Sequence, residues 1–442
     1  MFKTLREAFK MPDVRKKILI TLFILLIYRI GCFLPVPGID PELFNLDAEK
    51  GTGLATSGAA DFLRLMSSLA GGALANGAIL ALGVGPYITS SIVMQLMTIA
   101  IPSLERLNKQ GDEGRKKIAV YTRYVALFMS IAQAVAIVTS FAGAGSIMNN
   151  VFGAQVPGFV VSGIVILTLV AGSMFTVWLG DKITEHGVSN GMSMLIFVGI
   201  ISTGVGAFFS SIMNVVSDIS EIVNPLVFLA TLFLIFFFIV WVDLAERRIP
   251  VTYAKQIKGN KMYGGQSSVI PIKINATGVI PIIFAFAMLN FPQLIMSIFW
   301  PDSGAYRWFM LNLGTGTWAN IALTALLILG FTYFYATLSF KPEDVSRQIQ
   351  QNGGFILGYR PGPPTTLYLK KVSSRITLFG ALFLMFMALV PSLIFKAVVP
   401  DGGALLTAFT SIGLLIIVSV ALEFDKQLQG LMLMKSYKGF LK

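Results

Sequence analysis

About ten apolar stretches of roughly 18–26 residues run along the chain, and this feature constrains its fold most strongly. A helix rises about 1.5 Å per residue, so each stretch is long enough to cross the hydrocarbon core of a bilayer. We place them near residues 18–34, 76–101, 118–140, 159–179, 188–209, 225–242, 274–300, 318–339, 376–395 and 404–422. The sequence therefore predicts an all-α multi-pass membrane protein with ten transmembrane helices.

The basic residues gather on one side of these stretches. All but five of the 34 Lys and Arg residues lie at the two termini, in the loops after the second, fourth, sixth and eighth stretches, or at the stretch ends beside those loops. The five are Arg29, Lys50, Arg64, Arg307 and Lys396. Because basic segments remain in the cytoplasm, both termini are predicted to be cytoplasmic. The net charge of +12 is thus first an orientation signal and not a sign of nucleic-acid binding.

The apolar stretches contain almost no ionisable, metal-binding or catalytic side chains. Arg29 is essentially the one ionisable residue within them, and it lies near the outer end of the first stretch, where it can snorkel. Cys32 is the only cysteine and His186 the only histidine, so a disulfide or a cysteine metal cluster within the chain is excluded. No GxxxxGK[ST], HExxH or GxSxG motif occurs. We expect no enzyme, no metal and no cofactor, and no cleavable signal peptide before the first stretch.

The segment between the first two stretches is distinctive. Residues 35–60 are acidic and rich in turn residues, and they are followed by a nine-residue amphipathic pattern that ends before Gly71 and Gly72. Asp61 can cap a short helix there, and one face of it carries Phe62, Leu65, Met66 and Leu69. Nine helical residues span only about 14 Å, too little to cross a bilayer. Such a helix either lies on the outer surface or tucks into the bundle.

The two largest cytoplasmic loops are predicted to be folded. In the loop after the sixth stretch, residues 249–254 favour a strand and residues 258–261 a turn, which indicates a β-hairpin studded with Lys255, Lys258 and Lys261. In the loop after the eighth, Pro342 suits a helix start and Asn352 its end. A stiff Pro/Gly turn carrying Arg360 follows. These loops are either solvated topology determinants or a docking platform.

Five segments together resemble the SecY family, the channel subunits of the bacterial Sec protein translocase. The resemblance covers essentially the full length, and its combination of motifs is highly specific. The segments are 83–95 (GVGPYITSSIVMQ), 187–197 (GVSNGMSMLIF), 246–271 (ERRIPVTYAKQ through YGGQSSVIP), 275–281 (NATGVIP) and 358–362 (GYRPG).

The resemblance implies two pseudo-symmetric inverted halves, here residues 1–210 and 211–442, clamped around a central pore. An aliphatic ring at its waist would seal around a passing polypeptide, and the matching positions are Val84, Ile88, Met192, Ile196, Ile280 and Ile416. Met192 departs from the usual branched aliphatic residue. The short helix near 61–70 matches the family's plug. A lateral gate toward lipid would be formed by the second and third stretches against the seventh and eighth, with Gln95 and Asn275 as its candidate residues.

The family also implies partners, since the chain carries no nucleotide motif of its own. The two folded loops match the surface that binds the SecA motor ATPase or the ribosome, with candidate residues Arg247, Arg248, Lys255, Lys258, Lys261, Tyr359 and Arg360. SecE and SecG subunits would complete the complex in a bacterial inner membrane. Signal sequences and unfolded polypeptides would be the substrates.

Two other classes of protein remain open at the level of sequence. A secondary transporter also combines about ten spans with inverted repeats, but it needs an intramembrane coupling site, and stretches without carboxylates argue against one. A membrane scaffold or insertase without a pore would keep the basic loops and need neither plug nor constriction.

Overall fold

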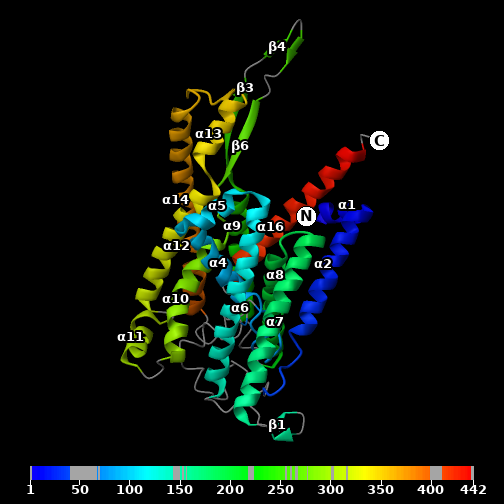
Figure 1. Ribbon diagram of the computed structural model, residues 1–442, viewed down its shortest axis with the longest axis vertical. Coiled ribbons are helices and arrows are strands. Elements are labelled where there is room, and N and C mark those ends of the chain that lie inside the picture. Colours follow the sequence, from blue (N-terminus) through cyan, green and yellow to red (C-terminus); the bar gives the residue numbers. More distant parts are fainter. Residues whose placement is uncertain are drawn as a thin grey trace. The chain divides into compact units, whose positions relative to one another are not determined.

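The computed structural model of this 442-residue chain is mostly helical (Figure 1). It describes residues 2–39, 67, 70–142, 150–151, 154–155, 157–217, 223–253, 256–258, 261–263, 267–275, 277–299, 303–314, 317–398 and 411–439. The chain divides into two compact units, each described here by itself. The first comprises Met1–Phe228, Leu289–Thr317 and Val399–Lys442, and the second comprises Leu229–Met288 and Trp318–Val398.

The first unit is built from helices that pack along one another. Its elements are α1 (Phe2–Lys10), α2 (Pro12–Gly31), α4 (Gly85–Ala100), α5 (Pro102–Lys109), α6 (Asp112–Ala142), α7 (Gly158–His186), α8 (Gly191–Ser217), α11 (Gly304–Leu313) and α16 (Ser411–Gly439), with the short strands β1 (Asn150–Val151) and β2 (Ala154–Gln155). α6 packs between α4 and α7, α7 contacts α2 and α8, and α16 contacts α1 and α8. Glycines permit these close approaches. A Cβ at Gly191, the first residue of α8, would overlap the carbonyl oxygen of Gly180 on α7, and one at Gly172 on α7 would overlap that of Ile79 in the turns before α4.

Two apolar clusters belong to the core of the first unit. The larger lies where residues 36–39 and 74–82 meet α6 and α7, and it includes Leu74, Leu82, Ala134, Val165 and Leu169. The smaller joins the end of α1 and the first part of α2 to α16 and to the connection between α7 and α8. Its buried residues are Ala8, Val14, Ile18, Val188 and Leu428. Both clusters bury aliphatic side chains from helices and from the turns between them, as the hydrophobic effect favours.

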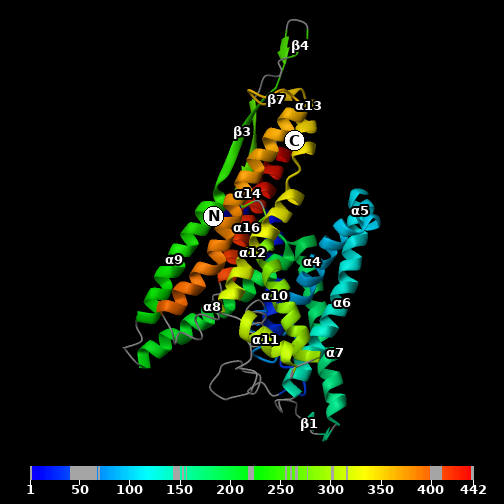
Figure 2. The ribbon, with the colours of Figure 1, turned by 90° about the vertical axis from the view of Figure 1, so that its left-hand side faces the viewer.

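The second unit combines long helices with a small sheet. Its helices are α12 (Trp318–Ser339), α13 (Pro342–Gln351) and α14 (Pro363–Val398), with most of α9 (Val223–Leu244) and the first part of α10 (Ile280–Phe299). Its strands are β3 (Glu246–Tyr253), β4 (Gln256–Lys258), β5 (Lys261–Tyr263), β6 (Ser267–Lys273) and β7 (Gly354–Phe355). β3 pairs antiparallel with β6 on one side and with β7 on the other, while β4 pairs antiparallel with β5. The sheet and α13 lie at one end of α12 and α14, and β4–β5 extends from them (Figures 1 and 2).

The sheet and α13 form one folded module from two separate loops. Its core consists of Ile249, Val251, Ile272, Ile349, Ile356 and Leu369, all nearly inaccessible to solvent. Alternation along β3 explains this packing, because Ile249 and Val251 point inward while Arg248 and Pro250 are exposed. The predicted hairpin and the helix predicted to begin at Pro342 are therefore both confirmed.

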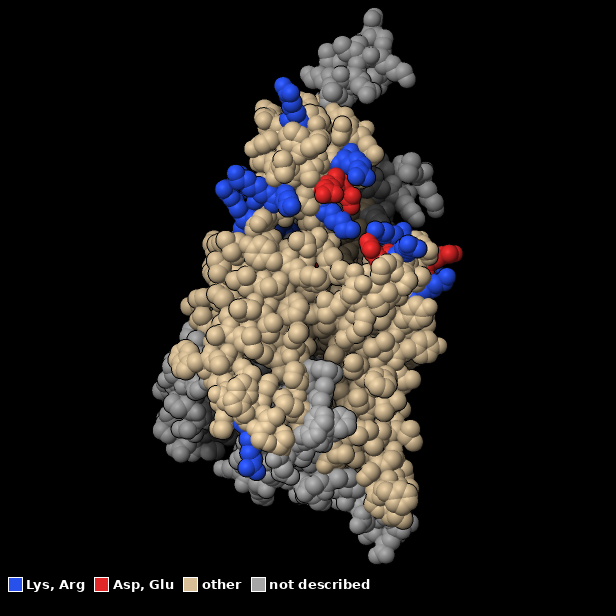
Figure 3. Space-filling model, turned by 60° about the vertical axis from the view of Figure 1, so that its left-hand side comes forward, with Lys and Arg blue, Asp and Glu red and all other residues tan. Residues whose placement is uncertain are grey.

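Among the described residues, five helices are long and apolar enough to cross a membrane, or six if the bent pair α4 and α5, which meet at 100°, counts as one span. The five segments are Asp112–Thr139, Gly158–His186, Gly191–Ser210, Trp318–Gln351 and Pro363–Val390. Figure 3 shows a broad band of uncharged side chains on the face it presents. Together with the family relationship below, these helices identify a multi-pass membrane protein.

The second predicted stretch, 76–101, is wrong in its first part. Residues 71–84 form successive turns, and the helix begins only at Gly85. Gly77 and Gly83 adopt positive φ angles of 56° and 52°, which a right-handed helix does not allow, and Pro86 then favours a helix start. The apolar composition of these residues reflects burial in turns and not helix.

Candidate pore, gate and docking surfaces

Five of the six candidate ring residues belong to the first unit. Val84 immediately precedes α4, and its carbonyl oxygen accepts a hydrogen bond of 3.0 Å from the backbone N–H of Ile88 one turn later. Ile196 lies on α8 and Ile416 on α16, and these two helices pack against each other. Val84, Ile196 and Ile416 are buried, with 2%, 7% and 4% of their surfaces exposed. Three of the candidate aliphatic side chains are thus buried within the first unit.

The other two candidates differ in their surroundings. Met192, one turn before Ile196 on α8, packs against α7, since a Cβ at Gly180 would lie 2.5 Å from the Met192 sulfur. Ile280 is the first residue of α10, belongs to the second unit and is 43% exposed. The ring as a whole stays a prediction, because its members are divided between the two units.

The candidate plug lies almost wholly outside the described residues. This holds for Asp61, Phe62, Leu65, Met66 and Leu69. The residues that follow are described, and Gly71 and Gly72 adopt positive φ angles of 71° and 81°. Two left-handed residues in succession explain why a sharp turn follows the amphipathic pattern.

The candidate gate residues make different contacts. Asn275 is 7% exposed, and its Nδ2 donates a hydrogen bond of 3.0 Å to Oδ1 of Asp243 at the end of α9. An ionised carboxylate only accepts hydrogen bonds, so this contact sets the orientation of the amide. The Oδ1 of Asn275 then faces the interior with no hydrogen-bond partner among the described groups. Gln95 lies on α4 in the first unit and donates to the Ser91 hydroxyl at 3.4 Å.

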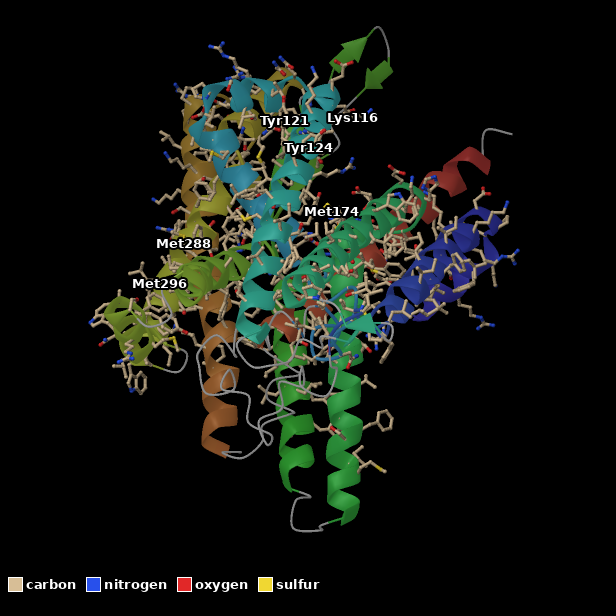
Figure 4. The ribbon with its side chains drawn as sticks, turned by 60° about the horizontal axis from the view of Figure 1, so that its bottom comes forward. Lys116, Tyr121, Tyr124, Met174, Met288 and Met296 are labelled. Atoms are coloured by element: carbon tan, nitrogen blue, oxygen red, sulfur yellow. The ribbon has the colours of Figure 1, made fainter. Side chains whose placement is uncertain are left out.

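α6, the third of the predicted spans, presents an aromatic face. Figure 4 shows Lys116, Tyr121 and Tyr124 along this helix. Tyr124 is 68% exposed, and Phe128 one turn later is 69% exposed. Rings of this kind suit the boundary between lipid and water or contact with a second transmembrane segment.

Four of the basic docking candidates, Arg247, Arg248, Lys258 and Lys261, belong to strands of the second unit. Arg247 and Arg248 are both exposed on β3, and Arg248 forms an ion pair of 2.8 Å with Glu246. Lys258 on β4 is directly opposite Lys261 on β5. Lys255 lies outside the described residues.

The turn that carries Arg360 is braced from several sides. The Ser346 hydroxyl donates a hydrogen bond of 3.1 Å to the carbonyl oxygen of Gly362, and the Thr365 hydroxyl donates one of 2.7 Å to that of Arg360. Gly358 and Gly362 have φ angles of 87° and 105°, so the tight turn requires glycine at both positions. Arg360 itself is exposed and has no ion-pair partner among the described residues. A rigid turn therefore presents a free guanidinium to solvent.

Among the described residues, no group of three or more His, Cys, Asp or Glu side chains is placed to hold a metal ion. Sequence reasoning treated Arg29 as a snorkelling residue, whereas its guanidinium donates a hydrogen bond to the carbonyl oxygen of Gly71. The sequence did carry a signal for such a contact, because an arginine inside a membrane-spanning stretch usually has a specific partner.

Comparison with known proteins gives concordant results. The SecY family model matches residues 78–424. The protein translocase subunit SecY of Streptomyces griseus is 39% identical over 451 aligned positions, which cover 100% of both chains. A solved structure described as that of a protein conducting channel has a TM-score of 0.65 at 20% identity, and 96% of each chain is covered.

A second solved structure, Sec61 in the canine ribosome-channel complex from the endoplasmic reticulum, has a TM-score of 0.57 at 18% identity, again over 96% of each chain. At such low identities these two structures show a shared fold. The match to the family and the full-length relative go further, and they show that the chain belongs to the SecY family.

Proposed function

We propose that this chain is a protein-conducting channel that passes unfolded secretory polypeptides across the bacterial cell membrane. The observation that carries the proposal is the full-length similarity to a protein translocase subunit SecY at 39% identity. The apolar helices and the fold shared with a protein conducting channel support it.

The ten apolar stretches would form two inverted halves, residues 1–210 and 211–442, with both termini in the cytoplasm. The aliphatic side chains of Val84, Ile88, Met192, Ile196, Ile280 and Ile416 would form the waist of the pore. A narrow apolar constriction expels water and so excludes ions, while flexible aliphatic side chains adapt to whichever residues pass. The segment near 61–70 would block the outer funnel of the idle channel.

A lateral gate would release hydrophobic segments into lipid. Gln95 on α4 and Asn275 before α10 would lie on its two sides. The uncompensated Oδ1 of Asn275 supports this role, because a buried acceptor without a donor is costly and gains most from a donor supplied on gate closure or by a signal sequence.

Energy would come from partners, and the channel itself would catalyse no reaction. The folded module of the 6/7 and 8/9 loops would bind the SecA motor ATPase or the translating ribosome, and SecE and SecG would complete the complex. The exposed arginine on a braced turn supports this docking role, since a guanidinium presented without an internal partner pairs bidentately with a carboxylate or phosphate.

Purified chain reconstituted with SecE and SecG into proteoliposomes tests the proposal. With SecA, ATP and a secretory precursor, the channel reading predicts protease-protected precursor inside the vesicles. A secondary transporter would instead accumulate a small solute under an ion gradient without SecA. A scaffold would do neither, and either of those results would contradict the proposal.

A further inference from the structure

The side chain of Arg29, near the end of α2, is held by two contacts. Nη1 of Arg29 donates a hydrogen bond of 2.9 Å to the carbonyl oxygen of Gly71, and the guanidinium lies 4.9 Å from the centre of the Phe33 ring. Both contacts are stronger in apolar surroundings than in water. Arg29 is therefore fixed on the turn that begins at Ala70, and its long side chain is not free to snorkel.

The same turn is attached to the end of α2 by three further contacts. The Cys32 thiol lies 3.6 Å from the carbonyl oxygen of Ala70 in hydrogen-bond geometry, and the carbonyl oxygen of Cys32 accepts a hydrogen bond of 3.4 Å from Asn76. The Leu80 side chain packs on Gly31, where an added Cβ would lie 2.5 Å from the leucine Cδ1. Residues 70–80 thus sit on α2 as one assembly.

This turn leads directly to the constriction. Gly83 has a φ of 52°, and a Cβ there would lie 2.9 Å from the Cβ of Ala70, so the two backbones are in close contact. The carbonyl oxygen of Gly83 accepts a hydrogen bond of 3.4 Å from the Ser173 hydroxyl on α7. The next residue is Val84, which is 2% exposed and immediately precedes α4. The position of Ala70 therefore sets the position of Gly83 and Val84.

We propose that Arg29 is a positioning residue for the channel's constriction. By holding the Gly71 carbonyl it keeps Ala70 against Gly83, and so keeps Val84 packed in the closed pore. The inference rests on the proposed function, since it assumes that Val84 lines a seal. It assigns to Arg29 a role distinct from topology and from snorkelling.

Two adjacent glycines provide a matched pair of variants. Gly71 and Gly72 both have positive φ angles, so an alanine at either position strains the backbone. An alanine Cβ at Gly71 would lie 3.0 Å from the Cα of Gly199 and 3.1 Å from Nη1 of Arg29, whereas one at Gly72 meets nothing within 4 Å. Only Gly71→Ala should disturb the contact with Arg29.

The experiment measures the conductance of the idle complex in planar bilayers, with thermal stability recorded for every variant. Arg29→Met removes the charge but keeps an apolar side chain, and Gly71→Ala displaces the acceptor. Each should raise idle conductance on the order of ten-fold, as expected when a hydrogen bond to a charged group no longer favours the closed state. Because both remove the same contact, the double variant should leak no more than the leakier single variant.

Three controls make the result specific. Arg29→Lys should restore most of the seal, since an ammonium donates to the same carbonyl and lies over the same ring. Gly72→Ala should leave conductance near wild type. Arg307→Met, which removes another predicted outer arginine, exposed on α11, should also leave it unchanged.

A wild-type seal in both Arg29→Met and Gly71→Ala would overturn the inference, as would equal leak in Gly72→Ala or multiplied leak in the double variant. The variant Ile88→Asn distinguishes a failure of the role proposed for Arg29 from a failure of the proposed constriction. If it leaks while Arg29→Met stays tight, only the role of Arg29 is wrong. If it too stays tight, the constriction assigned under the proposed function is wrong.

Discussion

The aromatic rings of Tyr359 and Tyr368 stack with their centroids 4.2 Å apart. The stack fixes the Pro/Gly turn on the first turns of α14, and Arg360 follows Tyr359 directly. Ser346 and Thr365 brace the same turn by hydrogen bonds. The backbone that carries the Arg360 guanidinium therefore has little conformational freedom. Binding then costs less conformational entropy, which is a property expected of a docking residue.

Reversing the charge of Arg360 tests this role. Arg360→Glu should abolish SecA-driven translocation into proteoliposomes, and Arg360→Lys should retain part of it, because lysine cannot form a bidentate pair. Arg347→Glu on the exposed side of α13 is the matched control and should transport near wild type. All three variants should insert and keep SecE. Normal transport by Arg360→Glu would mean that this arginine serves only topology.

The lysines at the hairpin tip should act together. Replacing Lys255, Lys258 and Lys261 with Glu should weaken binding of the ribosome or SecA at least ten-fold at low salt, while each single change has a smaller effect. Binding is measured by co-sedimentation over a salt series, and the wild-type advantage should shrink as salt rises. Unchanged affinity of the triple variant would remove these residues from the docking surface.

The predicted orientation of the loops depends on their charge and can be tested independently of transport. A cysteine at Lys258, in a background with Cys32→Ser, should resist a membrane-impermeant thiol reagent added outside intact cells. The same cysteine should react once the cells are opened. A cysteine in the 35–60 segment should react in intact cells. Labelling of position 258 from outside would invert the predicted topology.

The contact between Asp243 and Asn275 should stabilise the second unit. Asp243→Ala leaves the buried Nδ2 of Asn275 without its acceptor and should cost about 1–3 kcal/mol, seen as a lower thermal inactivation temperature of the purified complex. Asp243→Asn can still accept through its amide oxygen and should lose less. Wild-type stability of Asp243→Ala would show that the hydrogen bond contributes nothing measurable.

Hydropathy and turn residues predict a helix of this chain well where its bounds depend only on its own residues and their sequence neighbours. The stretch predicted at 318–339 coincides with α12, and Asn352 ends α13 as expected. The stretch predicted at 76–101 fails over its first part because hydropathy reports burial and not backbone conformation. Only the positive φ angles at Gly77 and Gly83 reveal the turns there.

Contacts between distant segments escape the same reasoning. Sequence patterns indicated two folded loops, but not that β7 and α13 of one loop close over β3 of the other around Ile249 and Ile349. Likewise, the sequence around Arg29 does not indicate that the carbonyl oxygen of Gly71, 42 residues away, accepts its hydrogen bond. The candidate ring depends on similarity to a family, because an aliphatic residue in a span has no local signature of a pore.

The proposed aliphatic seal at the waist of the pore is tested most directly by the single-channel conductance of the idle complex in planar bilayers. Replacing Ile88, Ile196, Ile280 and Ile416 with Ser or Asn should hydrate the waist and raise the ion leak, because a polar constriction no longer expels water. The same variant should accept precursors with weaker signal sequences, since the closed state loses apolar packing. Deleting residues 61–70 should also raise the leak while translocation largely survives. If both variants remain as tight as wild type, the chain does not form the proposed pore, and the scaffold reading becomes the better one.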